Sequence, residues 1–316
     1  RNTLIITFFV ETYSPGEKTP KLIIDTDIYS DVDDVAAIGV ANILHKQGSV
    51  QLLGVMVNTH SKYSGLSVGS VNNYYGHPEI PIATLKPLTN ETDRLDYGSI
   101  LGTQFANNGS YPEDPKIVYR TLLASNKNVI IVSIGFFENL VALLDSPADS
   151  ISHLNGIDLI KSSVDQIVIM GGEYPHSTKF PEFNFAENAK LTAQVVNTWP
   201  TRMVFSGFET GADIISGIPF CHKLSVRNPV REAYLVYNGC DKGRSSWDTI
   251  AVYFATFADK DKGFWKFGNN GGHNKINPDG KNEWVSSPNK DHHYIELNIK
   301  KEEMANRLNH ILLTHQ

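Results

Sequence analysis

The stretch KLIIDTDIYSDVDDVAAIGVANIL, residues 21–44, joins an apolar run, a cluster of five aspartates and an apolar periodic segment. The run 22–24 is short and continuous, as in a strand that is buried on both faces of a parallel sheet. From Val32 onwards apolar residues recur at helical spacing, and the segment stops near Gly48. The aspartates therefore stand where a strand ends and a helix begins, which is the edge at which open α/β sheets bind ligands.

The remainder of the chain repeats this alternation of strand and helix. Further strand-like apolar runs lie at 52–57, 80–85, 129–134, 166–170 and 203–205. Helical patterns lie at 139–144, 190–199, 247–257 and 302–313. This order predicts an α/β fold with an open, mostly parallel, doubly wound (Rossmann-like) sheet and helices on both faces. The polar stretches 86–115 and 268–293 are expected to be long loops within a single domain that spans residues 1–316.

Composition and charge exclude several classes of protein. The chain has 316 residues, of which 41% are hydrophobic and 20% charged, as in a globular protein with a sizeable core. A net charge of −6 and a pI near 6.0 argue against a nucleic-acid partner, because such partners favour basic patches. The sequence has no run of 18 apolar residues, so we expect no membrane span.

Three features bear on the cellular compartment. Residues 1–18 include the largely apolar run Leu4–Val10, which suits either a processed signal-peptide remnant or a structured first segment. Sequons at 90–92 and 108–110 are compatible with a secreted glycoprotein. Cys221 and Cys240 could form one bridge or remain two buried thiols. We expect secretion, with a cytoplasmic location as the alternative.

Five like charges within residues 25–34 require a counter-charge. Ser30, followed by Asp33, resembles a capping box at the start of the helix, but a helix N-terminus tolerates one or two carboxylates rather than five. Crowded carboxylates raise one another's pKa unless a cation intervenes, and no Lys or Arg lies between Lys21 and Lys46. The sequence therefore predicts a hard cation with oxygen ligands, Ca²⁺ or Mg²⁺. The alternative is a solvated acidic turn with an ordinary cap.

A second acidic helix start occurs in RSSWDTIAVYFATF, residues 244–257. Ser245 is the candidate N-cap, and Asp248 follows three positions later, before an apolar stripe. Taken alone, Asp248 is a capping residue. Together with the first cluster it becomes a candidate metal ligand from a second helix.

These segments resemble the inosine–uridine nucleoside hydrolases over nearly the whole chain, from about Lys21 to Leu313. The amino-terminal motif of that family, DxDxGxDD, appears as DTDIYSDVDD at 25–34, with two extra residues and Tyr29 where glycine is usual, as in a DTDIGxDxDD variant. VNNYYGHPEIPI resembles a helix-to-strand segment of the family, and IVSIGFFENLVALL stands where GPLTN is usual. IVIMGGEYP, PEFNFAENA, SGFETG and SSWDTIAVYFA then follow in family order.

The resemblance implies a Ca²⁺-dependent N-ribohydrolase and assigns its metal ligands. Asp27, Asp34 and Asp248 would hold the ion together with the backbone carbonyl of Glu138. The ion would also bind the ribose 2′- and 3′-hydroxyls and the attacking water. Asp27 would act as the general base.

The resemblance also implies which residues contact the sugar. Asp33 would lie beside the metal ligands as a further ribose partner. Glu182 and Asn184 of PEFN would hydrogen-bond the sugar hydroxyls, and Asn58 is a further candidate contact. Cleavage of the C1′–N bond passes through an oxocarbenium-like sugar, whose positive charge a ring of carboxylates would stabilise.

The sequence departs from the family at the leaving base. Well-known members place a histidine immediately before the last aspartate of the site, whereas this chain has Trp247. An indole donates a hydrogen bond but delivers no proton at neutral pH. It can stack on a base, which is worth roughly 1–3 kcal/mol in nucleic-acid complexes, or it can serve as an ordinary core aromatic. His176 is a candidate acid, with a surface loop histidine as the alternative.

The sequence thus favours an enzyme that hydrolyses a small-molecule ribonucleoside to ribose and free base. A second hypothesis is a pseudoenzyme that binds Ca²⁺ and ribose without turnover. A third is a haloacid dehalogenase-like phosphatase, because LIIDTDIY also fits the Asp-x-Asp start of that family. Tyr29 and the adjacent Asp33 and Asp34 do not suit the phosphatase. Members of the hydrolase family are often homo-oligomers, but the sequence indicates no interface.

Overall fold

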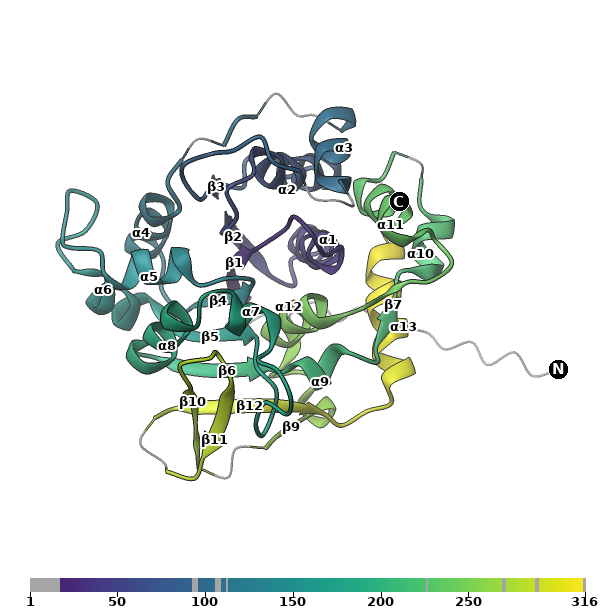
Figure 1. Ribbon diagram of the computed structural model, residues 1–316. Helices are drawn as coiled ribbons and strands as arrows, with labels where there is room; N and C mark the ends of the chain where they lie inside the picture. Colours follow the sequence, from purple (N-terminus) through teal and green to yellow (C-terminus); the bar gives the residue numbers. More distant parts are fainter. Residues whose placement is uncertain are drawn as a thin grey trace.

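An eight-stranded sheet forms the centre of the molecule (Figure 1). The computed structural model describes residues 18–92, 96–105, 109–111, 113–225, 227–268, 271–287 and 290–314. In spatial order the strands are β3 (Ile82–Thr84), β2 (Gln51–Val57), β1 (Lys21–Thr26), β4 (Val129–Ile134), β5 (Val164–Met170), β6 (Arg202–Ser206), β12 (His292–Leu297) and β9 (Trp265–Phe267). All neighbours are parallel except β9, which runs antiparallel to β12. The predicted open, mostly parallel α/β sheet is confirmed.

Each face of the sheet packs against its own layer of helices, and β1 shows how. Leu22 and Ile24 point into one core and Ile23 into the other, and all three are fully buried. The first core is formed with α1 (Asp33–Lys46), α2 (Lys62–Tyr75), α11 (Pro229–Asn238), α12 (Trp247–Phe257) and α13 (Lys301–Leu313). The second is formed with α4 (Pro115–Ser125), α5 (Glu138–Leu144), α6 (Gly156–Ser163) and α8 (Ala189–Thr198). Figure 1 shows these two groups on opposite sides of the strands.

The predicted strands and helices all occur, but several elements had no clear signal. The stretches expected to be loops contain α3 (Tyr97–Gln104) and a hairpin of β10 (His273–Ile276) and β11 (Asn282–Val285), so that prediction was wrong. Helix α2 also escaped prediction. Its sequence KYSGLSVGSVNNYY is rich in serine and glycine, which have low helix propensity, and its apolar face is narrow.

Small elements between the main strands and helices complete the fold. They are α7 (Phe183–Glu187), α9 (Phe208–Gly211), β7 (Ile215–Ser216), α10 (Ile218–Lys223), β8 (Arg244–Ser245) and the 3₁₀ helix η1 (Lys262–Phe264). Among the described residues no helix is both long and apolar enough to cross a membrane.

A disulfide joins Cys221 in α10 to Cys240, two residues beyond α11. Of the two alternatives that the sequence left open, the bridge is the one observed. Asn90, in the first sequon, is exposed. Asn108 of the second sequon and the segment 1–17 lie outside the described residues.

The disulfide generates a prediction about stability. A bridge between residues 19 positions apart restricts the unfolded chain and stabilises the fold by about 3 kcal/mol. We expect the double variant Cys221→Ser/Cys240→Ser to lose that amount in urea denaturation, and the reduced wild-type protein to lose the same. A variant with the denaturation midpoint of the oxidised wild-type protein would contradict this expectation.

Candidate active site

The site lies where the order of the strands reverses. Strand β1 pairs with β2 on one side and β4 on the other, and such a switch point opens a crevice beyond the carboxyl ends of the strands. Asp27 follows β1, and Gly135 follows β4. A Cβ atom on Gly135 would lie 2.5 Å from the Asp27 nitrogen, so only glycine permits this approach of the two chains.

A cavity of about 350 Å³ opens at this edge. Acidic, aromatic and other side chains line it: Asp27, Ser30, Asp31, Asp33, Asp34, Ile134, Met170, Glu182, Phe183, Asn184, Phe208, Tyr237, Arg244, Trp247 and Asp248. Its volume falls within the range of pockets that take small molecules. Of the site residues predicted from the sequence, the cavity brings together Asp27, Asp33, Asp34, Asp248, Glu182, Asn184 and Trp247.

Three carboxylates from two helices converge in the cavity. Asp33, Asp34 and Asp248 each offer one oxygen atom, and these atoms lie within 4.8 Å of one another. The side chains are almost completely buried, with Asp33 1% and Asp248 5% exposed. Burial first, and then the neighbouring negative charges, raises the pKa of all three well above the ordinary value. The group differs from the ligand set expected from the sequence, because Asp33 takes the place of Asp27.

Asp27 lines the same cavity without belonging to that group of three. Its side chain is buried, and burial followed by the charges of Asp31 and Glu182 raises its pKa to about 8. Its charge is the largest electrostatic contribution that raises the pKa of Asp34. Asp27 is therefore a buried carboxyl that lies in the same cavity as the group of three.

Asp33 has a role that the sequence did not reveal. One of its oxygens accepts the backbone N–H groups of Trp247, at 3.0 Å, and Asp248, at 3.1 Å. Asp33, the first residue of α1, therefore caps α12 and fixes the two helix starts against each other.

Both predicted serine caps are corrected by the structure. Helix α1 begins at Asp33 after Val32, without a side-chain cap, so Ser30 precedes the helix by too many residues. Helix α12 begins at Trp247 after Ser246, again without a cap from its own segment, and Ser245 instead donates to the carbonyl of Ala212.

Two of the five clustered aspartates are satisfied by other partners. Asp25 accepts hydrogen bonds from Tyr119, at 2.7 Å, from Asn58, at 2.7 Å, and from Asn139, at 3.0 Å. Complete burial raises its pKa to about 7 despite these bonds. Asp31 forms a two-pronged ion pair with Arg244, whose Nε lies 2.9 Å from one carboxylate oxygen. Of the described residues that line the cavity, only Arg244 carries a fixed positive charge.

The sugar-binding residues expected from PEFN lie on the cavity wall. Glu182 caps α7, since its carboxylate accepts the N–H groups of Gly172, Asn184 and Phe185. Burial raises its pKa to about 7. The Asn184 amide donates to the carbonyl of Met170 at 3.2 Å, which leaves its oxygen available to a ligand.

Three other predicted residues lie outside the lining of the cavity. The Asn58 amide is engaged by Asp25 and by the backbone of Phe136, so in this structure it supports the strand end. His176 is exposed in a loop whose backbone forms a bridge with Glu283. Glu138 begins α5 three residues beyond Gly135, at the same edge as Asp27, and its carbonyl remains a predicted ligand.

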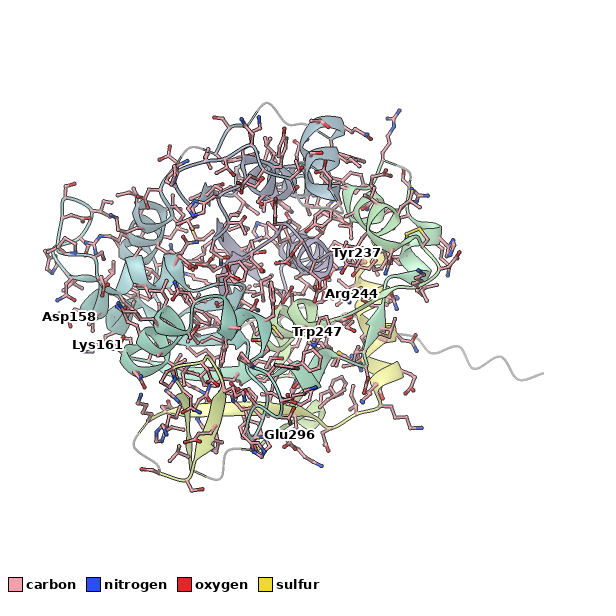
Figure 2. The ribbon with its side chains drawn as sticks, viewed as in Figure 1. Asp158, Lys161, Tyr237, Arg244, Trp247 and Glu296 are labelled. Carbon is pink, nitrogen blue, oxygen red and sulfur yellow. A yellow bond between two sulfur atoms is a disulfide. The ribbon has the colours of Figure 1, made fainter. Side chains whose placement is uncertain are left out.

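Aromatic groups form the remaining wall. The Trp247 indole N–H donates to the carbonyl of Phe208 at 2.8 Å, and the two rings lie 5.4 Å apart at 30°. The Arg244 guanidinium stands 4.9 Å from the Trp247 ring centre and 5.5 Å from that of Tyr237. Figure 2 labels Tyr237, Arg244 and Trp247, which follow one another down the view, and all three line the cavity. Phe183, which is 61% exposed, contributes an aromatic ring from α7.

The sequence did not identify Tyr237, Arg244 or Phe208 as site residues. Arg244 had one available signal, because it stands four residues before Asp248 and the acidic cluster required a cation. Tyr237 and Phe208 had none, since a single aromatic residue on a short helix is ordinary in a core.

Comparisons with known proteins identify the fold. The sequence matches no protein-family model and no curated protein. Among solved structures, an inosine–uridine preferring nucleoside hydrolase from Bacillus anthracis is 13% identical with a TM-score of 0.69, and the match covers 93% of this chain and 99% of that chain. A plant nucleoside hydrolase is 15% identical with a TM-score of 0.71, over 94% and 100% of the two chains.

A third similar structure is the type III effector protein XopQ, solved with adenosine diphosphate ribose. It is 14% identical with a TM-score of 0.68, and the match covers 94% of each chain. At these identities the likeness concerns the fold. The chain therefore has the nucleoside hydrolase fold.

The raised pKa values predict how stability depends on pH. Buried carboxyls such as Asp27, with a pKa of about 8, hold protons that the unfolded chain releases near pH 4. Without metal, the folded state therefore loses stability as the pH rises from about 4 to 8. We expect the melting temperature of chelator-treated protein to fall over this range and Ca²⁺ to restore it most at pH 8. A melting temperature that is independent of both pH and Ca²⁺ would contradict this prediction.

Proposed function

We propose that this protein hydrolyses the N-glycosidic bond of ribonucleosides to ribose and free base with the help of Ca²⁺. One observation carries the proposal. Asp27, Asp33, Asp34 and Asp248 gather at the switch point of the sheet, in one cavity with Glu182, Asn184 and an aromatic wall. This arrangement combines groups that can hold a cation, a sugar and a base.

The donor set fits a hard cation. All the converging ligand atoms of the cluster are carboxylate oxygens, which Ca²⁺ and Mg²⁺ prefer, and Arg244 is already engaged by Asp31. Asp34 and Asp248 would hold the ion with Asp33 or Asp27 and the carbonyl of Glu138. A bound ion would neutralise the carboxylates and supply a Lewis acid that lowers the pKa of water.

Asp27 is the carboxylate that we assign as general base. It faces the cavity at the end of β1, and its position is fixed by the close approach of Gly135. Burial raises its pKa in the metal-free site, and a bound cation would favour the ionised carboxylate, which can accept a proton. Asp27 would take the proton from water as the oxygen attacks C1′.

The sugar and the base would occupy opposite ends of the cavity. Glu182 and the free oxygen of Asn184 would orient the ribose hydroxyls, and the surrounding carboxylates would stabilise positive charge on the ring. The base would stack against the wall of Trp247 and Phe208. Tyr237 and Arg244 supply the hydrogen-bond donors of that wall, and they would bind the departing base.

A second candidate function is nucleoside binding without turnover. Trp247 favours it, since its indole N–H is already bonded to Phe208 and no imidazole is found among the described residues that line the cavity. A phosphatase is less favoured, because none of those residues is a lysine. Chelator-sensitive release of ribose separates turnover from mere binding, and release of phosphate from p-nitrophenyl phosphate would favour the phosphatase.

We further propose that the protein works in an oxidising compartment after secretion. The Cys221–Cys240 bridge and the exposed Asn90 support this location. An expressed and secreted protein should lose mass at Asn90 on treatment with an N-glycosidase. A reduced, unglycosylated protein isolated from the native cell would contradict secretion.

The central test removes the general base, Asp27. We expect Asp27→Asn to lower ribose release from inosine, uridine or adenosine by about 10²–10⁴-fold, because the amide cannot accept the proton. Asp158→Asn, an exposed change in α6 far from the cavity, is the matched control and should leave the rate unchanged. Full activity of the Asp27 variant would refute the assignment.

A second variant tests the aromatic wall. We expect Trp247→Ala to raise KM and change the preference among bases, since stacking is lost while the carboxylates remain. Trp247→Phe keeps an aromatic face and should restore most of the affinity. Equal kinetics of the alanine variant and the wild-type protein on every base would exclude a role for Trp247 in binding the base.

A further inference from the structure

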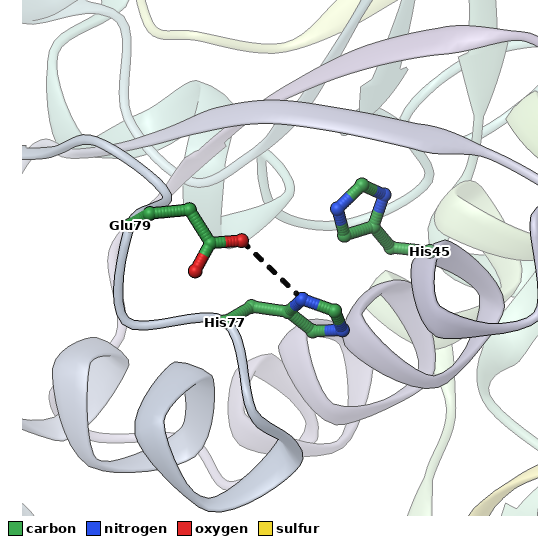
Figure 3. Close-up of side chains that lie close together, drawn as sticks. All are labelled: His45, His77 and Glu79. Carbon is green, nitrogen blue, oxygen red and sulfur yellow. Dashed lines mark ion pairs between the residues drawn. The ribbon is translucent and has the colours of Figure 1, made fainter.

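A second cluster of metal-binding side chains lies at the other end of α1. His45 belongs to the last turn of that helix, and His77 and Glu79 lie in the turn between α2 and β3. One ligand atom from each residue lies within 4.8 Å of the other two. Figure 3 shows the three side chains pointing toward one another. We propose that these residues form a binding site for a transition-metal ion of the Zn²⁺ class.

The hydrogen bonds of His45 orient it as a metal ligand. Its Nδ1 lies 3.2 Å from the carbonyl of Val50 and 3.4 Å from the N–H of Leu52. The Leu52 N–H donates to Nδ1 in one tautomer, whereas in the other tautomer a protonated Nδ1 donates to Val50 and leaves Nε2 unprotonated. Ligating histidines commonly donate their other ring N–H to a backbone carbonyl, as in the second tautomer. We assign this second tautomer to the metal-bound state.

His77 adds a second imidazole and Glu79 a carboxylate. The Nδ1 of His77 lies 3.5 Å from the carboxylate of Glu79, and the ring centres of His77 and His45 are 4.6 Å apart. The Nε2 of His77 is buried and has no hydrogen-bond partner. The Nδ1 that faces Glu79 is the nitrogen through which His77 would bind a metal in this group of three.

The geometry suits a tetrahedral ion with an open position. Bonds of about 2.0–2.1 Å to nitrogen and oxygen place the ligands of tetrahedral zinc roughly 3.3 Å from one another. Glu79 can close the remaining distance by rotation, because its side chain is 68% exposed. Three protein ligands at the surface leave the fourth position to water.

This site differs from the carboxylate cluster in chemistry and in place. Two imidazoles and one carboxylate favour zinc or a similar transition metal, whereas an all-oxygen set favours Ca²⁺. The two clusters stand at opposite ends of α1, about 18 Å apart between Asp33 and His45 at 1.5 Å per residue. An ion bound by His45, His77 and Glu79 would cross-link the end of α1 to the turn that precedes the edge strand β3.

A zinc titration in excess Ca²⁺ tests the site. Untagged, chelator-treated full-length protein with saturating Ca²⁺ is titrated with Zn²⁺ against a chromophoric chelator at pH 7.5. We expect one Zn²⁺ per chain, a rise in melting temperature, and a visible Co²⁺ spectrum typical of tetrahedral coordination. His45→Gln, His77→Gln and the exposed Glu79→Gln should each weaken zinc binding at least tenfold and abolish the rise in melting temperature.

The matched control is His222→Gln. His222 is an exposed histidine that lies 2.8 Å from Asp241, and the pair belongs to neither group of three ligands found among the described residues. This variant should bind zinc as the wild-type protein does, and so should Asp248→Asn. The proposal is overturned if no zinc binds in excess Ca²⁺, if the Glu79 and His77 variants retain wild-type affinity, or if Asp248→Asn alone removes binding.

Discussion

The turn after β1 holds more buried carboxyl groups than Arg244, the one basic side chain among the described residues that line the cavity, can neutralise. Two ionised carboxylates 4.8 Å apart repel by about 3–4 kcal/mol at an effective dielectric constant of 20. Several such pairs would offset much of a typical net stability of 5–15 kcal/mol. The cluster can persist only if bound protons or a cation neutralise most of its negative charge. We propose that the site exchanges protons for a metal ion, and the proposed chemistry depends on that exchange.

The fold holds these groups together through a few specific contacts. Gly135 lets the chain after β4 pass against Asp27, and Asp33 caps α12 so that Asp248 arrives beside Asp34. Beneath them, Asp25 is held by neutral donors from three other segments, which anchors the end of β1. The carboxylate cluster is thus a consequence of how two helix starts and two strand ends meet.

Local sequence patterns predicted much of this arrangement. Continuous apolar runs marked the strands from β1 to β6, and crowded aspartates at 25–34 indicated the edge at which the carboxylates gather. The cation itself stays a prediction. Contacts between distant segments could not be predicted. Asp31 and Arg244 are 213 residues apart, and the cap that Asp33 provides to α12 replaces the serines that local patterns suggested. Asn58 shows the same limit, because only the packed structure reveals that Asp25 engages its amide.

The fold alone does not decide between turnover and binding. Solved proteins of similar fold include nucleoside hydrolases and an effector that was crystallised with adenosine diphosphate ribose. In this chain the carboxylates and the proposed sugar contacts, Glu182 and Asn184, line one cavity, while the residue before Asp248 is a tryptophan. The aromatic wall of Trp247, Phe208 and Tyr237 is therefore the part of the site in which its substrate preference would reside.

The exchange of protons for metal can be measured directly by calorimetry. Ca²⁺ is titrated into the metal-free protein at pH 7 in two buffers with different ionisation enthalpies. If the buried cluster holds protons, one Ca²⁺ binds per chain and at least one proton is released as it does so. Folded protein that binds no Ca²⁺, or that binds it with no release of protons, would contradict the central claim.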